Sequence, residues 1–189
     1  EFYHKYHIVA WMKRFSEIMC QMYSEKIKQP MNTLIIRPGN LYGPYDKFNW
    51  LESKVIPSLI RRSIERHNPI NVWGDGLDLK DFLYIDDYIE GMLLAMDKIE
   101  EYQPINIASG IPITIKELLS SILIATDYEN ATVNYDKTKP TMIPKRMIDI
   151  TLATKLLGWK PKISISEGIK RTVDWYKKYY KNNTPEDKS

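Results

Sequence analysis

Helical and strand patterns alternate along almost the whole of this 189-residue chain. Apolar residues recur at steps of three and four over residues 8–28, which predicts an amphipathic helix that ends before Pro30. A β-branched run at residues 33–37 predicts a buried strand, and a second helix is expected over Val55–Ile64 after a long loop. The alternation indicates a mixed α/β fold.

The rest of the chain alternates in the same way. Further strands are expected at four places: residues 70–73, 82–85 and 105–108, and near Val133. Helices should begin at Thr114, with Glu117 at the spacing of a capping box, and at Ser166, which should cap the last helix. We expect residues 1–181 to form one folded unit and residues 182–189 to form a flexible polar tail.

Composition and charge narrow the possible partners. Lys and Arg number 27 against 24 Asp and Glu, and a net charge of +3 is too small to indicate nucleic-acid binding. No apolar run approaches the roughly 20 residues that span a bilayer, and no signal peptide opens the chain, so a cytoplasmic location is expected. Cys20 is the only cysteine, and no residues have the spacing of metal ligands.

The sequence lacks the glycine-rich turn on which a dinucleotide-binding fold depends. That turn lets the backbone and a helix N-terminus approach the pyrophosphate of the cofactor. Gly74 and Gly76 begin the GxGxxG pattern, but Leu79 occupies the place of the third glycine. The chain opens on Glu1 rather than on methionine, so we expect it to be part of a longer protein whose cofactor-binding half lies elsewhere.

Four short motifs follow one another in a fixed order. They are Ala10-Trp-Met-Lys-Arg14, Arg37-Pro-Gly-Asn-Leu-Tyr-Gly-Pro44, Val72-Trp-Gly-Asp-Gly76 with Lys80-Asp-Phe-Leu-Tyr-Ile-Asp-Asp87, and Ile148-Asp149 with Leu156-Leu-Gly-Trp-Lys-Pro161. Together they resemble the NAD-dependent nucleotide-sugar epimerases and dehydratases of the extended short-chain dehydrogenase/reductase family, and the GDP-L-fucose synthase branch in particular. The resemblance implies the C-terminal portion of a Rossmann-like fold with its small substrate-binding subdomain.

The resemblance also implies a reaction centre. The family uses a Tyr-x-x-x-Lys pair, in which tyrosine transfers a proton while lysine lowers its pKa and holds the cofactor ribose. Lys13 occupies the place of the lysine, but Val9 occupies that of the tyrosine. Tyr6 lies seven residues from Lys13, roughly 10 Å along a helix, and is a poor substitute. Lys54 stands where the fucose-synthase branch has an acid/base histidine, so Lys13 and Lys54 are the catalytic positions.

Further positions are implied for ligands. Toward a nucleotide-sugar substrate they are Asn40, Val55, Trp73, Lys80 and Arg146, with added charge from Arg61, Arg62 and Lys145. Toward NAD or NADP they are Lys13, Pro38 and Asn40. Lys80 replaces an arginine and keeps its charge, but it loses the bidentate fork. Two of these positions also have a purely structural explanation: Asn40 could serve a turn, and Trp73 could be buried in a strand. Tyr42 could stack on a ligand or hydrogen-bond it, or it could cover the core.

Three functions remain open from the sequence. The first is the substrate-binding half of an NAD(P)-dependent nucleotide-sugar epimerase or reductase, inactive on its own because Val9 replaces the tyrosine. The second is a non-catalytic nucleotide-sugar-binding or regulatory module, and the third is a structural interaction domain. Apolar residues extend around much of the first helix, including Trp11 and Phe15, so we expect it to bind a second copy or the missing N-terminal half.

Overall fold

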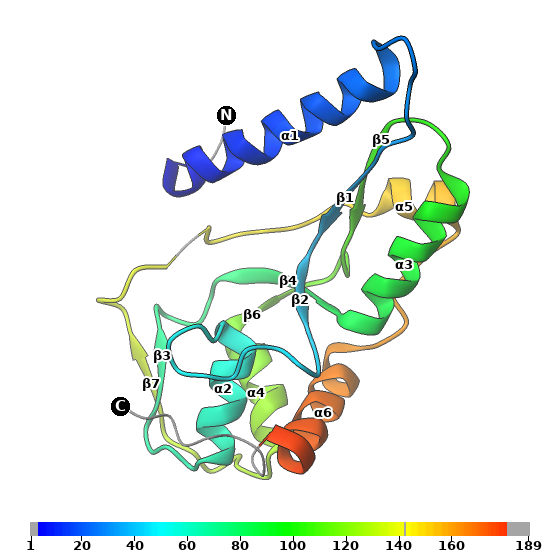
Figure 1. Cartoon of the computed structure of the whole chain (residues 1–189). Helices are drawn as coiled ribbons and strands as arrows, with labels where there is room; N and C mark the ends of the chain where they lie inside the picture. Colours follow the sequence, from blue (N-terminus) through cyan, green and yellow to red (C-terminus); the bar gives the residue numbers. More distant parts are fainter. Residues whose placement is uncertain (1–3, 142, 181–189) are drawn as a thin grey trace.

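The computed structural model describes residues 4–141 and 143–180 as a mixed α/β fold, which confirms the expected class (Figure 1). In chain order the elements are η1 (His4–Tyr6), α1 (His7–Glu25), β1 (Leu34–Pro38), β2 (Asn40–Tyr42), α2 (Val55–Ile64), β3 (Ile70–Trp73), β4 (Leu79–Tyr84), α3 (Ile85–Lys98), β5 (Gln103–Ile107), β6 (Pro112–Thr114), α4 (Ile115–Ala125), β7 (Val133–Asp136), α5 (Thr151–Leu157), α6 (Ile165–Trp175) and the π-helical turn η2 (Tyr176–Tyr180).

The strands form three small groups. β1 pairs with β5 and β3 pairs with β7, both in parallel, so each pair joins segments that lie far apart in the sequence. In the third group β4 is central, with β2 parallel on one side and β6 antiparallel on the other. The β2–β4 register sets Asn40 opposite Phe82, which brings the second and third sequence motifs together.

Two buried clusters stabilise the fold. The larger one lies among α2, α4, α6 and the neighbouring strands, and it includes the fully buried Ile60, Leu118 and Ile169. The smaller one lies among α3, α5, β1 and β5, with Ile105 and Trp159 at its centre. Each such side chain contributes about 1.5–3 kcal/mol by leaving water. These clusters fix β4 and α2, which carry much of the candidate site.

Two short strands lie where the sequence predicts loops. Asn40–Tyr42 and Pro112–Thr114 each pair with β4, although the glycine and proline residues around them favour turns. Three residues are too few to show the alternating pattern of a strand, so these segments can be identified as strands only from their pairing with β4. The prediction of a loop after Pro38 is therefore wrong at residues 40–42.

The last helix begins earlier than predicted. Its cap is Ser164, not Ser166, because the Ser164 hydroxyl accepts the backbone N–H of Glu167. A capping side chain bonds the amide two or three residues further on, and Ser166 lies inside the helix instead. The helix proper ends at Trp175, before the turn η2, and the predicted tail at residues 182–189 lies outside the described residues.

Helix α1 lies apart from both buried clusters, beside β1 (Figure 1). None of its residues is buried, and Trp11 and Phe15 keep more than half of their surface exposed. Within residues 4–141 and 143–180, no helix combines the length and apolar character that a membrane crossing demands.

Candidate functional site

Two adjoining cavities border the start of α2 and strand β4, and β2 lines the first of them while β3 lines the second. The first, here called the Asn40 cavity, has a volume of about 300 Å³ and is lined by Tyr6, Asn40, Leu41, Asp46, Lys54, Val55, Ile56, Pro57, Lys80, Phe82, Ile143 and Arg146. The second, the Trp73 cavity, has a volume of about 440 Å³, and its walls include Trp50, Lys54, Val55, Ser58, Arg62, Trp73, Asp78, Lys80 and Thr141. Lys54, Val55 and Lys80 line both cavities and form their junction.

The start of α2 forms one side of this junction. Lys54 is the N-cap residue, in an extended conformation, and its carbonyl accepts the backbone N–H of Ser58. Val55 opens the helix, and the first turn carries no acidic side chain. The helix therefore presents unpaired backbone N–H groups and a partial positive charge at the junction.

Lys80 forms the opposite side of the junction, on β4. Its ammonium donates to the Asp78 carboxylate at 3.1 Å and to the carbonyl oxygen of Ile143. The Lys80 and Asp78 side chains are 18% and 17% exposed, so the pair is largely shielded from water. Lys80 is thus held in one position, and an anionic ligand would share its charge with Asp78.

Asn40 and Arg146 lie together in the Asn40 cavity. The Asn40 side-chain nitrogen donates to the carbonyl of Asp81 at 2.7 Å, and its oxygen accepts from Arg146 at 3.4 Å. Arg146 reaches this place because backbone bonds join Leu79 to Pro144 and Arg146. Asn40 therefore ties β2 to β4 and to the Arg146 segment, a structural role that exists whether or not it touches a ligand.

Trp73 lies in the other cavity, at the end of β3. It is 62% exposed, so the alternative of a buried strand tryptophan is wrong. Trp50 faces the same cavity and was not singled out by the sequence, because it lies in an irregular loop between motifs. Two indole side chains therefore border this cavity.

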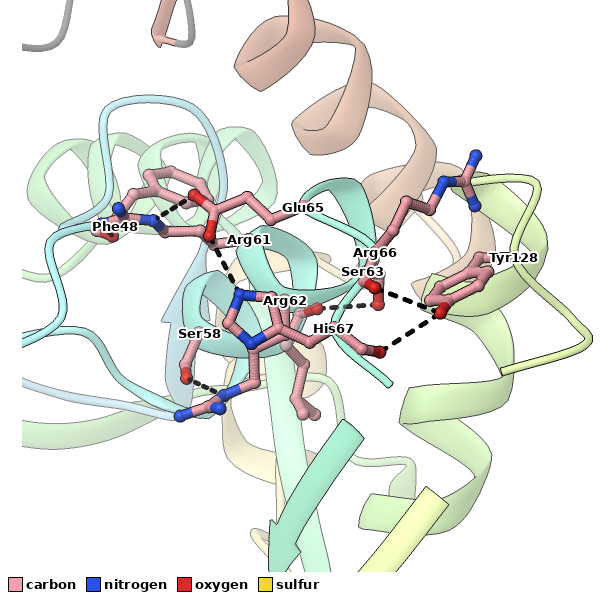
Figure 2. A network of polar contacts seen from close by, with 10 residues as sticks. Phe48, Ser58, Arg61, Arg62, Ser63, Glu65, Arg66, His67 and Tyr128 are labelled. Carbon is pink, nitrogen blue, oxygen red and sulfur yellow. Dashed lines mark hydrogen bonds and ion pairs between the residues drawn. The ribbon is translucent and has the colours of Figure 1, made fainter. Parts of the chain in front are cut away.

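Two arginines of α2 lie against the ring of Trp50. The guanidinium groups of Arg61 and Arg62 lie 4.2 and 5.0 Å from the centre of its ring. Arg61 is paired with Glu65 at 2.7 Å, whereas Arg62 donates to the Ser58 hydroxyl at 3.4 Å (Figure 2). Among the described residues no carboxylate pairs with Arg62, so its charge remains available to the Trp73 cavity that it lines.

Six of the positions implied by the motifs lie on these walls. Asn40, Lys54, Val55, Lys80 and Arg146 line the first cavity, and Trp73 lines the second. Of the residues expected to add charge, Arg62 also lines the second cavity, whereas Arg61 and Lys145 line neither. Lys13 and Pro38 line neither cavity; both are exposed, on α1 and at the end of β1. Tyr6, which sequence reasoning set aside, lines the Asn40 cavity.

Tyr42 belongs to the core rather than to the site. It is 3% exposed and packs edge-on against Tyr84 with ring centres 5.6 Å apart. Burial raises the pKa of the Tyr42 hydroxyl well above its usual range, and nearby Tyr84 and Asp87 add to the shift. Such a group stays protonated and does not exchange protons near neutral pH.

The described residues do not by themselves fit a dinucleotide. The sequence holds no GxGxxG turn, and Lys13 and Pro38 are exposed without a shared cavity. The side chain of Val9 is apolar and can donate no hydrogen bond, and the residue is 55% exposed. Within the described part of the chain, no group of three or more His, Cys, Asp or Glu side chains could hold a metal ion.

Comparison with known proteins gives the family that the motifs resemble. The family described as the NAD dependent epimerase/dehydratase family matches residues 9–108. GDP-L-fucose synthase 1 of Arabidopsis thaliana is 34% identical over 163 residues, which cover 84% of this chain and 49% of that protein. GDP-L-fucose synthase of Escherichia coli is 31% identical over 171 residues, which cover 84% and 52%.

Solved structures give the same class. A UDP-glucose 4-epimerase from Thermotoga maritima, solved with UDP-glucose, superposes with a TM-score of 0.79 at 28% identity, covering 88% of this chain and 52% of that one. A UDP-glucuronic acid 4-epimerase from Bacillus cereus, solved with UDP-glucuronic acid and NAD, gives 0.75 at 28% identity, covering 88% and 51%.

The fold is thus that of a Rossmann-like epimerase or dehydratase. The chain belongs to the NAD-dependent epimerase/dehydratase family, as the motifs predicted. It spans about half the length of the curated relatives that it matches.

Proposed function

We propose that this chain supplies the nucleotide-sugar-binding half of an NAD(P)-dependent epimerase or reductase, with residues 1–181 as its folded unit. One observation carries the proposal: the two cavities meet at a junction lined by Lys54, Val55 and Lys80. A nucleoside diphosphate sugar has the same three-part layout, with a base, a central diphosphate and a sugar.

The Trp73 cavity suits the base. Trp73 and Trp50 offer aromatic surface, and stacking of a base on an aromatic side chain is worth about 1–3 kcal/mol. Val55, at the start of α2, adds an apolar contact near the junction. Arg62 lines the same cavity and suits a ribose or phosphate oxygen.

The junction suits the diphosphate. Lys54 and Lys80 supply two positive charges, and the N-terminus of α2 adds a partial one. Asp78 offsets part of the charge of Lys80, so affinity should be modest in this chain alone. The sugar would then lie in the Asn40 cavity, beside Asn40 and Arg146.

The chemistry of the cofactor lies beyond this chain. When bound, NAD or NADP supplies hydride transfer to and from the sugar, and we propose that Lys13, Pro38 and Asn40 face it in the assembled enzyme. Because Val9 carries no transferable proton, we propose that this chain alone does not turn over a nucleotide sugar. We propose Lys54, which lines both cavities, as a second position that acts on the bound ligand.

A partner would complete this half. Trp11 and Phe15 are 53% and 63% exposed on α1, which supports contact with a second copy or with a segment that supplies the cofactor site. A purely regulatory nucleotide-sugar-binding module is the second candidate, and Val9 favours it. Turnover by the chain after a glycine-rich cofactor segment is added in trans would support the enzyme over the module.

Ligand binding tests the proposal directly. Titration calorimetry with GDP-L-fucose and with UDP-glucose should give binding by the wild-type chain, weakened by salt because the contacts are ionic. Lys80→Ala should weaken it at least about fivefold, or about 1 kcal/mol, since a charge-assisted hydrogen bond is lost. Lys170→Ala, an exposed lysine of α6 outside both cavities, is the matched control and should bind as wild type. Absence of binding at millimolar ligand, or equal loss in both variants, would rule the proposal out.

A further inference from the structure

We propose that the Tyr6 hydroxyl contacts the sugar of the ligand in the Asn40 cavity. The proposal rests on the function proposed for that cavity and goes beyond it, because no motif of the sequence assigns Tyr6 a role. It concerns binding and orientation of the sugar and includes no proton-transfer step.

The position of Tyr6 is set by the turn that precedes α1. Tyr6 ends η1 and is the N-cap residue of α1, with φ −111° and ψ 7°. Among the described residues of η1 and α1, it is the one that lines the Asn40 cavity. Val9 lies nearly one helical turn further on and lines neither cavity. The N-terminal end of α1 therefore reaches the site through Tyr6 and not through the position that matches the family tyrosine.

The sequence-based argument against Tyr6 does not apply to this role. That argument measured Tyr6 from Lys13, as a replacement for the tyrosine of the Tyr-x-x-x-Lys pair. In the structure Tyr6 shares a cavity with Asn40 and Lys54, and Lys13 is not among the lining residues. A contact with the sugar requires that Tyr6 lie near Asn40 and Lys54, and it does not require Lys13.

The chemistry around Tyr6 matches a sugar ring. Its hydroxyl can both donate and accept, and Asp46 brings a carboxylate to the same wall. One Asp46 oxygen accepts the backbone N–H of Lys47 at 2.7 Å, which fixes the orientation of the group. Leu41 and Phe82 add apolar surface for the C–H faces of the ring. Polar edges with apolar faces are what a pyranose presents.

The two cavities separate the contacts of the sugar from those of the base. Trp50, Trp73 and Arg62 line the Trp73 cavity, and Tyr6 is not among its walls. Loss of the Tyr6 hydroxyl should therefore affect a ligand that carries a sugar and spare one that ends at the diphosphate. This difference between two ligands separates a sugar contact from a general effect on folding.

The test compares ligands with and without the sugar. Calorimetry should be run with GDP and GDP-L-fucose, and with UDP and UDP-glucose, on the wild-type chain and on Tyr6→Phe. We expect Tyr6→Phe to weaken binding of the preferred nucleotide sugar about fivefold, as for one lost hydrogen bond, and to change binding of its nucleoside diphosphate less than about twofold. The ring is kept, so packing is preserved. Tyr23→Phe, on α1 but outside both cavities, should bind all four ligands as wild type.

The outcomes distinguish this proposal from the one on which it rests. If wild type binds the nucleotide sugar and Tyr6→Phe binds it equally well, the role of Tyr6 is refuted while the site stands. An equal loss for the sugar-bearing and sugar-free ligands would also refute it. If wild type binds none of the four ligands, both proposals fail.

Discussion

Helix α1 and helix α4 are both rich in apolar residues, but they differ in how far those residues are buried. α4 has 11 residues and buries five of them, Ile115, Leu118, Leu119, Ile122 and Leu123. α1 has 19 residues and buries none. Figure 1 shows α4 among other elements and α1 at one edge of the molecule, beside β1. An apolar pattern therefore predicts that one face of a helix is buried, but it does not identify the segment or partner that buries it.

Polar contacts join α1 to the segment that follows it and to β1. Arg37 on β1 donates two hydrogen bonds to the Glu17 carboxylate, at 2.7 and 2.6 Å. The Thr33 hydroxyl donates to the carbonyl of Cys20 at 3.1 Å. Such contacts are worth far less than a buried apolar cluster, because one partner remains in water.

The largest expected effect contrasts the two helices directly. Leu118→Ala should lower the free energy of unfolding by about 3–4 kcal/mol, since it leaves a cavity in the larger cluster. Phe15→Ala, on the exposed face of α1, should change it by less than about 0.5 kcal/mol when the chain is a monomer. Urea denaturation followed by circular dichroism measures both. A loss near 2 kcal/mol for Phe15→Ala would mean that α1 is covered in solution, and a dependence on protein concentration would identify a second copy as the cover.

A smaller effect is expected at the N-cap of α6, and it tests how much this one capping side chain contributes to the free energy of unfolding. Ser164→Ala should cost about 1 kcal/mol, because the Glu167 amide loses its side-chain acceptor. Ser166→Ala, two residues along and inside α6, is the matched control and should stay within about 0.5 kcal/mol. The same denaturation assay applies, and a larger loss for Ser166→Ala would return the cap to the position that the sequence favoured.

The smallest effect concerns the attachment of α1. The hydrogen bond from Arg37, with help from Arg14, lowers the pKa of Glu17 below its usual value of 4.5, although burial opposes the shift. The folded pKa lies below the unfolded one, so this contribution is present above pH 4.5 and is lost as the pH falls through the folded pKa.

Glu17→Gln should therefore cost under about 1 kcal/mol near pH 7, after allowance for solvent screening of Arg37. The difference between wild type and variant should shrink as the pH is lowered from 5 to 3. Hydrogen exchange of the α1 amides is the sensitive measurement, because it reports local opening of this helix. A difference that persists unchanged at pH 3 would show that the carboxylate charge is not its source.

Much of the fold was predictable where the signal is local. The capping box of Thr114 and Glu117 forms as expected, and α5 stops at Gly158, which adopts a left-handed φ of 67°. Helix α2 and strand β3 also lie where their patterns placed them. Strand β2 was missed, because pairing with β4 and not its own sequence makes it a strand.

The sequence by itself determined the family, and the resemblance also pointed to several residues that line the cavities, among them Asn40, Lys54, Lys80 and Arg146. Only the tertiary structure decided that Tyr6 and Trp50 join them and that Lys13 does not. The physical reason is that a cavity wall is assembled from elements that meet by strand pairing and core packing. The sequence gives the distance between two residues along a helix, but it does not give their distance across a cavity. That second distance depends on the pairing of β2 with β4 and on the turn before α1.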